Sequence, residues 1–282
     1  MWGLFPLYWP LLKPAGAVEI LSHRIVWSVV LLVAILALTH GFRWARDLDR
    51  RRVLLLGLAA ALITINWGVF IYGVNSDHVV ETSLGYFINP LVTVALAVSV
   101  MGERLRRAQW AAVAIAGVAV AVLTLAYGRP PWIALILAFS FGFYGLVKKQ
   151  VGLEGTQSLA VETAFLTAPA LALVIWFAVS GKGTFGHEGA GHALLMIGGG
   201  VATAIPLMLF GAAAIRVPLT TIGLLQYLAP IMQFLIGVLI YDEHMALSRW
   251  LGFVLVWVAV IVFTVDSVRA MNRARVVRLA QG

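Results

Sequence analysis

The sequence predicts an all-α integral membrane protein with ten transmembrane helices, the first of them truncated, arranged as a 5+5 inverted repeat. Three observations predict this class. The 282 residues are 62% hydrophobic and 11% charged, with a mean hydropathy of +0.97, which is more apolar surface than a soluble core can hide. Apolar runs long enough to cross about 30 Å of hydrocarbon follow one another along the chain. Finally, one segment recurs later in the sequence.

The recurring segment keeps a constant offset of 140 residues. LGYFINP at 84–90 corresponds to LLQYLAP at 224–230, Glu103 to Glu243, and Trp110 to Trp250. Each copy has an apolar helix with an internal proline, a short charged turn and another apolar helix. Two five-helix units must lie upside down to one another in the membrane, an arrangement found in secondary transporters with the substrate site between the halves. We therefore expect a first repeat at 1–127, a second at 128–268 and a basic cytoplasmic tail at 269–282.

Nine apolar runs predict full-length spans, at about 19–39, 53–74, 80–101, 108–127, 131–149, 158–180, 193–215, 218–240 and 246–267. Residues 1–12 are apolar but too short to span, and they contain Pro6 and Pro10. They form either a re-entrant half helix or the second half of a first helix whose start lies upstream. The second interpretation is favoured because ten helices complete the repeat.

Basic residues predict the orientation. If both termini are cytoplasmic, the outer side holds five of the 20 Lys and Arg residues, namely Lys13, Arg24, Arg129, Lys182 and Arg249. The other fifteen then lie inside, as the positive-inside rule requires, so we expect a multi-pass protein of the bacterial inner membrane. The net charge of +8 therefore reflects membrane topology, and no nucleic-acid partner is expected. The absence of Cys excludes disulfides and Cys-based zinc sites.

Polar side chains inside the spans need a reason, because a charged one costs at least about 2.5–3.5 kcal/mol on insertion scales. Glu19 and His23 lie four residues apart, and Arg24 lies about one turn deeper than Glu19. Arg24 either snorkels and pairs with Glu19, or faces a central cavity where it can hold an anionic or carboxylate-bearing substrate. The two interpretations are compatible.

Further polar and aromatic residues lie at mid-membrane depth in both halves. Tyr86, Asn89 and Pro90 follow each other at i, i+3 and i+4 on one stripe, and Gln226, Tyr227 and Pro230 repeat this pattern. Proline interrupts the helical hydrogen bonds, so Pro90 and Pro230 are expected hinges. The predicted substrate-binding residues are Arg24, Asn66, Trp67, Tyr72, Tyr86, Asn89, Gln226 and Tyr227.

Two carboxylates are candidates for proton coupling. A buried Glu162 near the start of the span at 158–180 could titrate near neutral pH, or it could simply lie at the interface. Glu19 is the second candidate. Glu103 and Glu243 are instead expected to order the tight turns with their neighbouring arginines.

Catalytic, metal and cofactor sites are not expected. His187-Glu188 and His192 have the spacing H-E-x-x-x-H, which does not place the two histidines on one helical face. The alternatives kept are an intramembrane enzyme using Glu19, His23 and Arg24 on a lipid-like substrate, and a non-transporting receptor subunit. The oligomeric state is not predicted.

Three segments carry a family resemblance: EILSHRIVWS at 19–28, Asn66-Trp67 with Tyr72, and ETSLGYFINPL at 81–91. They resemble the RarD branch of the EamA-type drug/metabolite transporter superfamily, and the similarity covers almost the whole chain. The resemblance implies ten helices in a 5+5 inverted repeat with both termini inside. It also implies a permease that exports or exchanges small metabolites and drugs, in a branch named for a link with chloramphenicol sensitivity. Together with Arg24, this predicts a small substrate that is amphipathic or anionic. The resemblance does not supply the physiological substrate.

Overall fold

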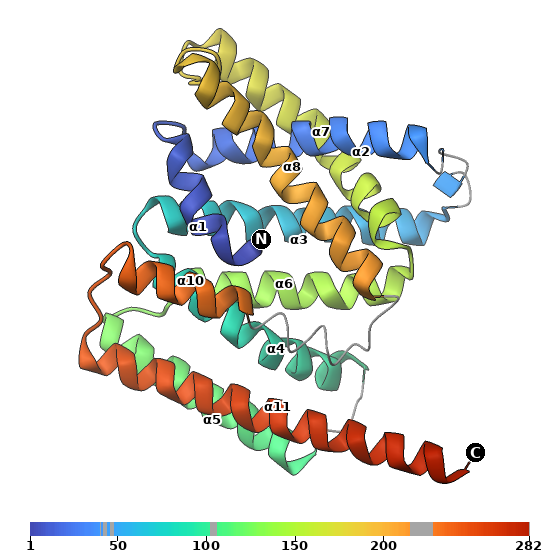
Figure 1. The fold of residues 1–282 in the computed structure, drawn as a ribbon, viewed down its shortest axis with the longest axis vertical. Coiled ribbons are helices and arrows are strands. Elements are labelled where there is room, and N and C mark those ends of the chain that lie inside the picture. The colour runs from blue at the N-terminus through green and yellow to red at the C-terminus, as the bar shows by residue number, and fades with distance from the viewer. Residues whose placement is uncertain (40, 42–43, 46–47, 102–105, 215–227, 282) are drawn as a thin grey trace.

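The computed structural model describes residues 1–281 except 40, 42–43, 46–47, 102–105 and 215–227. All regular elements in that part of the chain are helices (Figure 1). The long ones are α2 (Ala17–Leu38), α3 (Arg50–Asn75), α4 (Val79–Met101), α5 (Arg107–Tyr127), α6 (Trp132–Val151), α7 (Gly155–Val179), α8 (Gly189–Ala214), α10 (Leu228–Leu239) and α11 (Leu247–Gln281).

Six helices of the described chain are long and apolar enough to cross a membrane. They are the candidate spans Ala17–Leu38, Arg50–Asn75, Arg107–Ala126, Gly155–Val179, Gly189–Leu209 and Leu247–Ala270. Shorter apolar helices cover Trp132–Lys148 and Leu228–Leu239. The prediction of an all-helical membrane protein is therefore confirmed. The predicted tail at 269–282 differs in one respect: α11 continues through it as a helix to Gln281.

The N-terminal residues form three short turns, η1 (Trp2–Leu4), α1 (Phe5–Tyr8) and η2 (Trp9–Leu12). Prolines near the start of α1 and η2 break them up, because proline lacks the N–H that a continuing helix requires. This segment is nevertheless packed into the bundle. Trp9 is fully buried, and the Tyr8 hydroxyl donates to the Leu195 carbonyl of α8 at 2.6 Å.

Helices of the two predicted repeats alternate through the molecule. α5 and α11 lie along each other at one end, α6 lies between α3 and α4, and α2 packs on α7 and α8 at the other end (Figure 1). α10 packs against α4. An ion pair of 2.6 Å between Arg106 and Asp266 joins α5 to α11. Glu103, the expected partner of Arg106, lies outside the described residues.

Two glycines let helices of opposite halves approach closely, as small residues do in membrane bundles. A Cβ atom on Gly200 of α8 would lie 2.5 Å from the carbonyl carbon of Trp27 and 2.6 Å from the amide nitrogen of Ser28, both on α2. A Cβ on Gly85 of α4 would lie 2.8 Å from the Ala134 carbonyl oxygen of α6. Both helix pairs therefore depend on the absence of a side chain at these positions.

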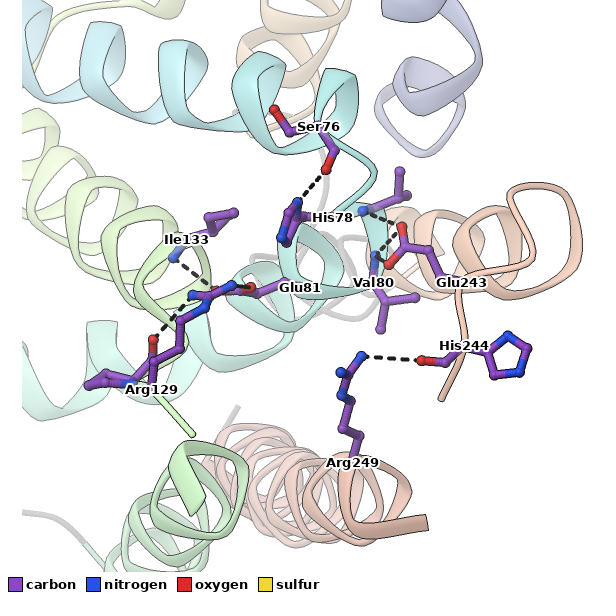
Figure 2. A network of polar contacts seen from close by, with 11 residues as sticks. Ser76, His78, Val80, Glu81, Arg129, Ile133, Glu243, His244 and Arg249 are labelled. Atoms are coloured by element: carbon purple, nitrogen blue, oxygen red, sulfur yellow. Dashed lines mark hydrogen bonds and ion pairs between the residues drawn. The ribbon is translucent and has the colours of Figure 1, made fainter. Parts of the chain in front are cut away.

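Buried Glu81 ties α4 to the start of α6. Its carboxylate accepts a hydrogen bond of 3.1 Å from the Ile133 amide and forms an ion pair of 3.1 Å with Arg129 (Figure 2). A carboxylate at a helix N-terminus satisfies free amides and complements the helix dipole. The first half thereby caps a helix of the second half.

Glu243 makes the reciprocal contact. Its carboxylate accepts from the amides of Val79 and Val80 at the start of α4, with 3.1 Å between Val80 N and Oε2 (Figure 2). Arg249 donates to the carbonyl oxygen of His244 at 3.2 Å. Glu243 was expected to order its own turn with Arg249, and the charge of Arg249 does act on it. Its carboxylate also reaches across to α4, where two helix amides need an acceptor.

Candidate functional site

A cavity of about 80 Å³ lies where helices of both halves converge. This is room for several water molecules or a small ligand. Among the described residues of its wall, Arg24 carries a charge and none is a carboxylate. The wall is formed by Trp2, Phe5, Arg24, Ile63, Asn66, Trp67, Phe70, Tyr86, Asn89, Phe141, Leu207, Ala229, Pro230 and Gln233.

Arg24 is buried, with 3% of its side chain area exposed. Its guanidinium carbon lies 4.2 Å from the centroid of the Trp67 ring and 5.0 Å from that of Trp9, with Phe5 at 5.7 Å. Such contacts partly compensate a desolvated cation. Nε donates to the Thr203 hydroxyl of α8, whereas Nη1 has no hydrogen-bond partner among the described residues. The arginine of the cavity wall therefore keeps a buried donor without a partner in this part of the structure.

Of the two interpretations of Arg24, the pairing with Glu19 is not found. The Glu19 carboxylate accepts from the amides of Thr184 and Phe185, at 2.7 and 3.3 Å, and from the Thr184 hydroxyl at 3.1 Å. Three donors of the connection between α7 and α8 thus occupy Glu19. His23 stacks on Phe185, with ring centroids 4.5 Å apart. Arg24 is left facing aromatic rings and the cavity.

Asn66 of α3 is hydrogen-bonded to two other helices, α6 and α4. Its amide nitrogen donates to the Leu137 carbonyl and the Ser140 hydroxyl of α6, both at 3.0 Å, and its oxygen accepts from the Tyr86 hydroxyl at 3.1 Å. The Tyr86 oxygen keeps its acceptor capacity, because its only proton goes to Asn66. Asn66 therefore holds the phenol of Tyr86 in place at the cavity wall.

The second half contributes Pro230 and Gln233 of α10. The Gln233 amide donates to the Trp2 carbonyl at 3.2 Å, and its oxygen has no partner among the described residues. Gln233 was not predicted as a binding residue, although it lies three residues after Pro230 on the same stripe. The two predicted substrate-binding residues of this half, Gln226 and Tyr227, lie outside the described residues.

The structure brings Arg24, Asn66, Trp67, Tyr86 and Asn89 together around the cavity. Tyr72 lies elsewhere: its side chain is 45% exposed and packs on Trp132, with ring centroids 5.7 Å apart. Helical phase explains the difference, because a residue six positions after Asn66 lies about 120° away around the helix. The same phase favours Ile63 and Phe70, at i−3 and i+4 from Asn66, which sequence reasoning missed.

Glu162 belongs to a separate polar cluster between α6 and α7 and does not line the cavity. Its carboxylate is fully buried and lies 2.7 Å from the Lys148 ammonium. It also accepts from the hydroxyls of Tyr144 at 3.0 Å and Ser158 at 2.7 Å. Its partner Lys148 could not be foreseen, because the contact depends on how α6 packs on α7.

A family model described as the EamA-like transporter family matches residues 1–125 and again 130–265. The chain belongs to this family. The EamA-like family is one of membrane transporters, so the protein is a multi-pass membrane transporter, and the intramembrane-enzyme alternative is set aside. The two matched regions each supply helices to the cavity, which is consistent with a repeat.

Individual relatives agree with this family and with the RarD resemblance. Protein RarD of Streptomyces exfoliatus is 57% identical over 277 residues, covering 98% of this chain and 88% of that protein. Protein RarD of Escherichia coli (strain K12) is 38% identical over 275 residues, covering 97% and 93%. A protein described as an uncharacterized transporter of Vibrio cholerae is 39% identical over 279 residues, covering 98% and 92%. The resemblance is thereby confirmed.

A solved crystal structure shares the fold of this EamA-like chain. Its sequence is 16% identical, and the superposition has a TM-score of 0.62 while covering 95% of this chain and 94% of the other. At this identity the likeness concerns the fold alone. The described residues hold no group of three or more His, Asp or Glu side chains placed to bind a metal ion.

Proposed function

We propose that this protein is a secondary active transporter or permease that moves a small metabolite or drug across the bacterial inner membrane by alternating access. The observation that carries the proposal is a buried arginine without an acidic partner among the described residues, facing a cavity between two EamA-matched halves. Burying a cation in a membrane is costly, so such a residue usually marks a functional site. Secondary transporters have their substrate site at the interface of the repeats.

The site suits a small amphipathic or anionic substrate. Arg24 supplies the charge and a free donor, and Trp67 and Tyr86 supply flat apolar surfaces with a polar edge. Asn89 completes the first-half wall, and Asn66 orients Tyr86. The predicted Gln226 and Tyr227 remain part of the proposal as the second-half contribution.

Alternating access requires the halves to move relative to each other. We retain the ten-helix, 5+5 inverted arrangement with cytoplasmic termini, supported by the repeat and by the distribution of basic residues. Pro90 within α4 and Pro230 within α10 are the proposed hinges; Pro230 is buried in the cavity wall. Pro90 acts by leaving the Tyr86 carbonyl of α4 without its usual helical donor.

Proton coupling is proposed for Glu162 rather than Glu19. Glu162 is fully buried beside the Lys148 ammonium, a partner from which its carboxylate can accept a proton. The Glu19 carboxylate is occupied by three donors of one loop, which favours a structural role. Glu162→Gln should make transport in vesicles independent of a pH gradient. Identical wild-type rates with and without the gradient would remove the coupling proposal.

The function is tested by comparing the metabolites of cells that lack and cells that overproduce the protein. The proposal expects a compound whose level differs between the two, and loss of that difference in Arg24→Ala with unchanged protein in the membrane. Tyr72→Ala, outside the cavity, is the matched control and should keep the difference. An Arg24→Ala protein that behaves like the wild type would contradict the assigned site.

A further inference from the structure

Thr203 of α8 is absent from the predicted site but contacts its central charge. Its hydroxyl donates to the Gly199 carbonyl one turn earlier at 2.8 Å. A hydroxyl carries one proton, so the oxygen is left as an acceptor, and Arg24 Nε donates to it. Thr203 is 1% exposed and Arg24 is 3% exposed, which means that water does not replace this contact.

The contact fixes one edge of the guanidinium. Nε is directed to α8, the guanidinium carbon lies 4.2 Å from the centroid of the Trp67 ring, and Nη1 remains without a hydrogen-bond partner among the described residues. An arginine recognises a carboxylate through two parallel N–H donors in a fixed plane. Holding Nε at Thr203 and the guanidinium carbon over Trp67 therefore sets the plane in which the terminal N–H groups can meet a planar anion.

We propose that Thr203 is a positioning residue, which orients Arg24 so that the cavity selects carboxylate-bearing substrates over their neutral isosteres. The inference rests on the proposed function, since it assigns the substrate class of the same cavity. Arg24 belongs to the first matched region and Thr203 to the second. The anion site is therefore complete only when α2 and α8 are packed together, and a movement of α8 away from α2 releases the guanidinium.

Ser28 provides a matched control for this inference. Its hydroxyl also joins α2 to α8, donating to the Gly200 carbonyl at 3.2 Å, and it is fully buried. Ser28→Ala thus removes a comparable helix–helix hydrogen bond without touching Arg24. Thr203→Ser keeps the acceptor oxygen, whereas Thr203→Val keeps the shape and removes it. Thr203→Ala is a second variant without the oxygen, so a folding failure of Thr203→Val does not remove the test.

The test measures binding of benzoate and of its neutral isostere benzamide to the purified protein. We expect the wild type to bind benzoate more tightly than benzamide. Thr203→Val and Thr203→Ala should weaken benzoate binding about tenfold or more, the effect of losing a hydrogen bond to a charged group, with benzamide binding unchanged. Thr203→Ser and Ser28→Ala should stay within about twofold of the wild type, the range expected when a substitution leaves the charged contact in place.

The other outcomes separate this inference from the proposed function. If Arg24→Gln loses benzoate binding but Thr203→Val does not, the arginine site stands and the positioning role falls. If neither loses it, the assigned site itself falls. Equal loss of both probes in Thr203→Val and Ser28→Ala would show a structural role only and overturn the inference. A wild type without preference for benzoate would overturn the carboxylate class.

Discussion

The Lys148 ammonium lies 2.7 Å from the fully buried carboxylate of Glu162 and joins α6 to α7. The same carboxylate accepts from Tyr144 and Ser158, so every side chain around it is a donor. A buried ion pair contributes little compared with an apolar pair, but removing one partner leaves a charge without compensation. The pair therefore makes the junction of α6 and α7 sensitive to single substitutions.

Lys148→Met should lower the free energy of unfolding by about 3–5 kcal/mol, the usual cost of breaking a buried pair. Lys148→Met with Glu162→Gln should recover most of the loss, because neither charge then remains. Thermal unfolding of the purified protein at pH 7.5 measures both. Lys182→Met, at an exposed position, is the control and should change stability by less than about 0.5 kcal/mol. If Lys148→Met lowered stability no more than Lys182→Met, the predicted cost of breaking the pair would be contradicted.

Glu243 should make stability depend on pH. Burial raises the pKa of its carboxyl from 4.5 to about 7, with Asp77 adding to the rise, while the amides of Val80 and Val79 and the charge of Arg249 oppose it. The folded protein therefore holds this proton more tightly than the unfolded chain. Stability from this group is fully present below about pH 4.5 and is lost as pH rises through about 7.

Glu243→Gln should flatten that slope, since the amide does not titrate but still offers an oxygen to the start of α4. The expected difference between pH 5 and pH 8 is on the order of 2 kcal/mol in the wild type. Unfolding midpoints measured across this pH range provide the check, with His244→Gln of the same loop as the control. Parallel pH profiles for wild type and Glu243→Gln would rule out this carboxyl as the cause.

Gly200→Ala should disturb the packing of α2 on α8. The new Cβ would meet the backbone of Trp27 and Ser28 at 2.5 and 2.6 Å, so the helices must separate, at a cost of about 1–3 kcal/mol for an overpacked contact. Gly145→Ala in α6 is the control, since its Cβ would meet nothing within 4 Å, and alanine favours the helix. Unfolding midpoints should fall for the first and hold or rise for the second. A stable Gly200→Ala would show that α2 and α8 pack less tightly than described.

Sequence reasoning located most of the helices, because lipid-facing and buried residues are both apolar and a long run marks a span wherever it packs. Helices α2 to α8 begin and end within a few residues of the predicted spans. The partners of polar residues were harder to foresee. Arg24 meets Thr203 and Glu19 meets Thr184, contacts between distant segments that depend on packing and leave no local pattern.

The cavity residues of α3 could have been predicted from the sequence by their position around the helix. Ile63, Asn66, Trp67 and Phe70 line the cavity at i, i+3, i+4 and i+7, which is one face of a helix. Grouping polar residues by depth alone added Tyr72, which lies on another face.

The central claim is that two halves open one cavity to each side of the membrane in turn. The chain has no cysteine, so a single Cys at Ala229 of the cavity wall is a clean reporter. Labelling with a membrane-impermeant maleimide, in right-side-out and inside-out vesicles, measures its access from each side. The account predicts labelling from both sides for Ala229→Cys and, at most, from one side for Tyr72→Cys outside the cavity. Labelling of Ala229→Cys from one side only would contradict it.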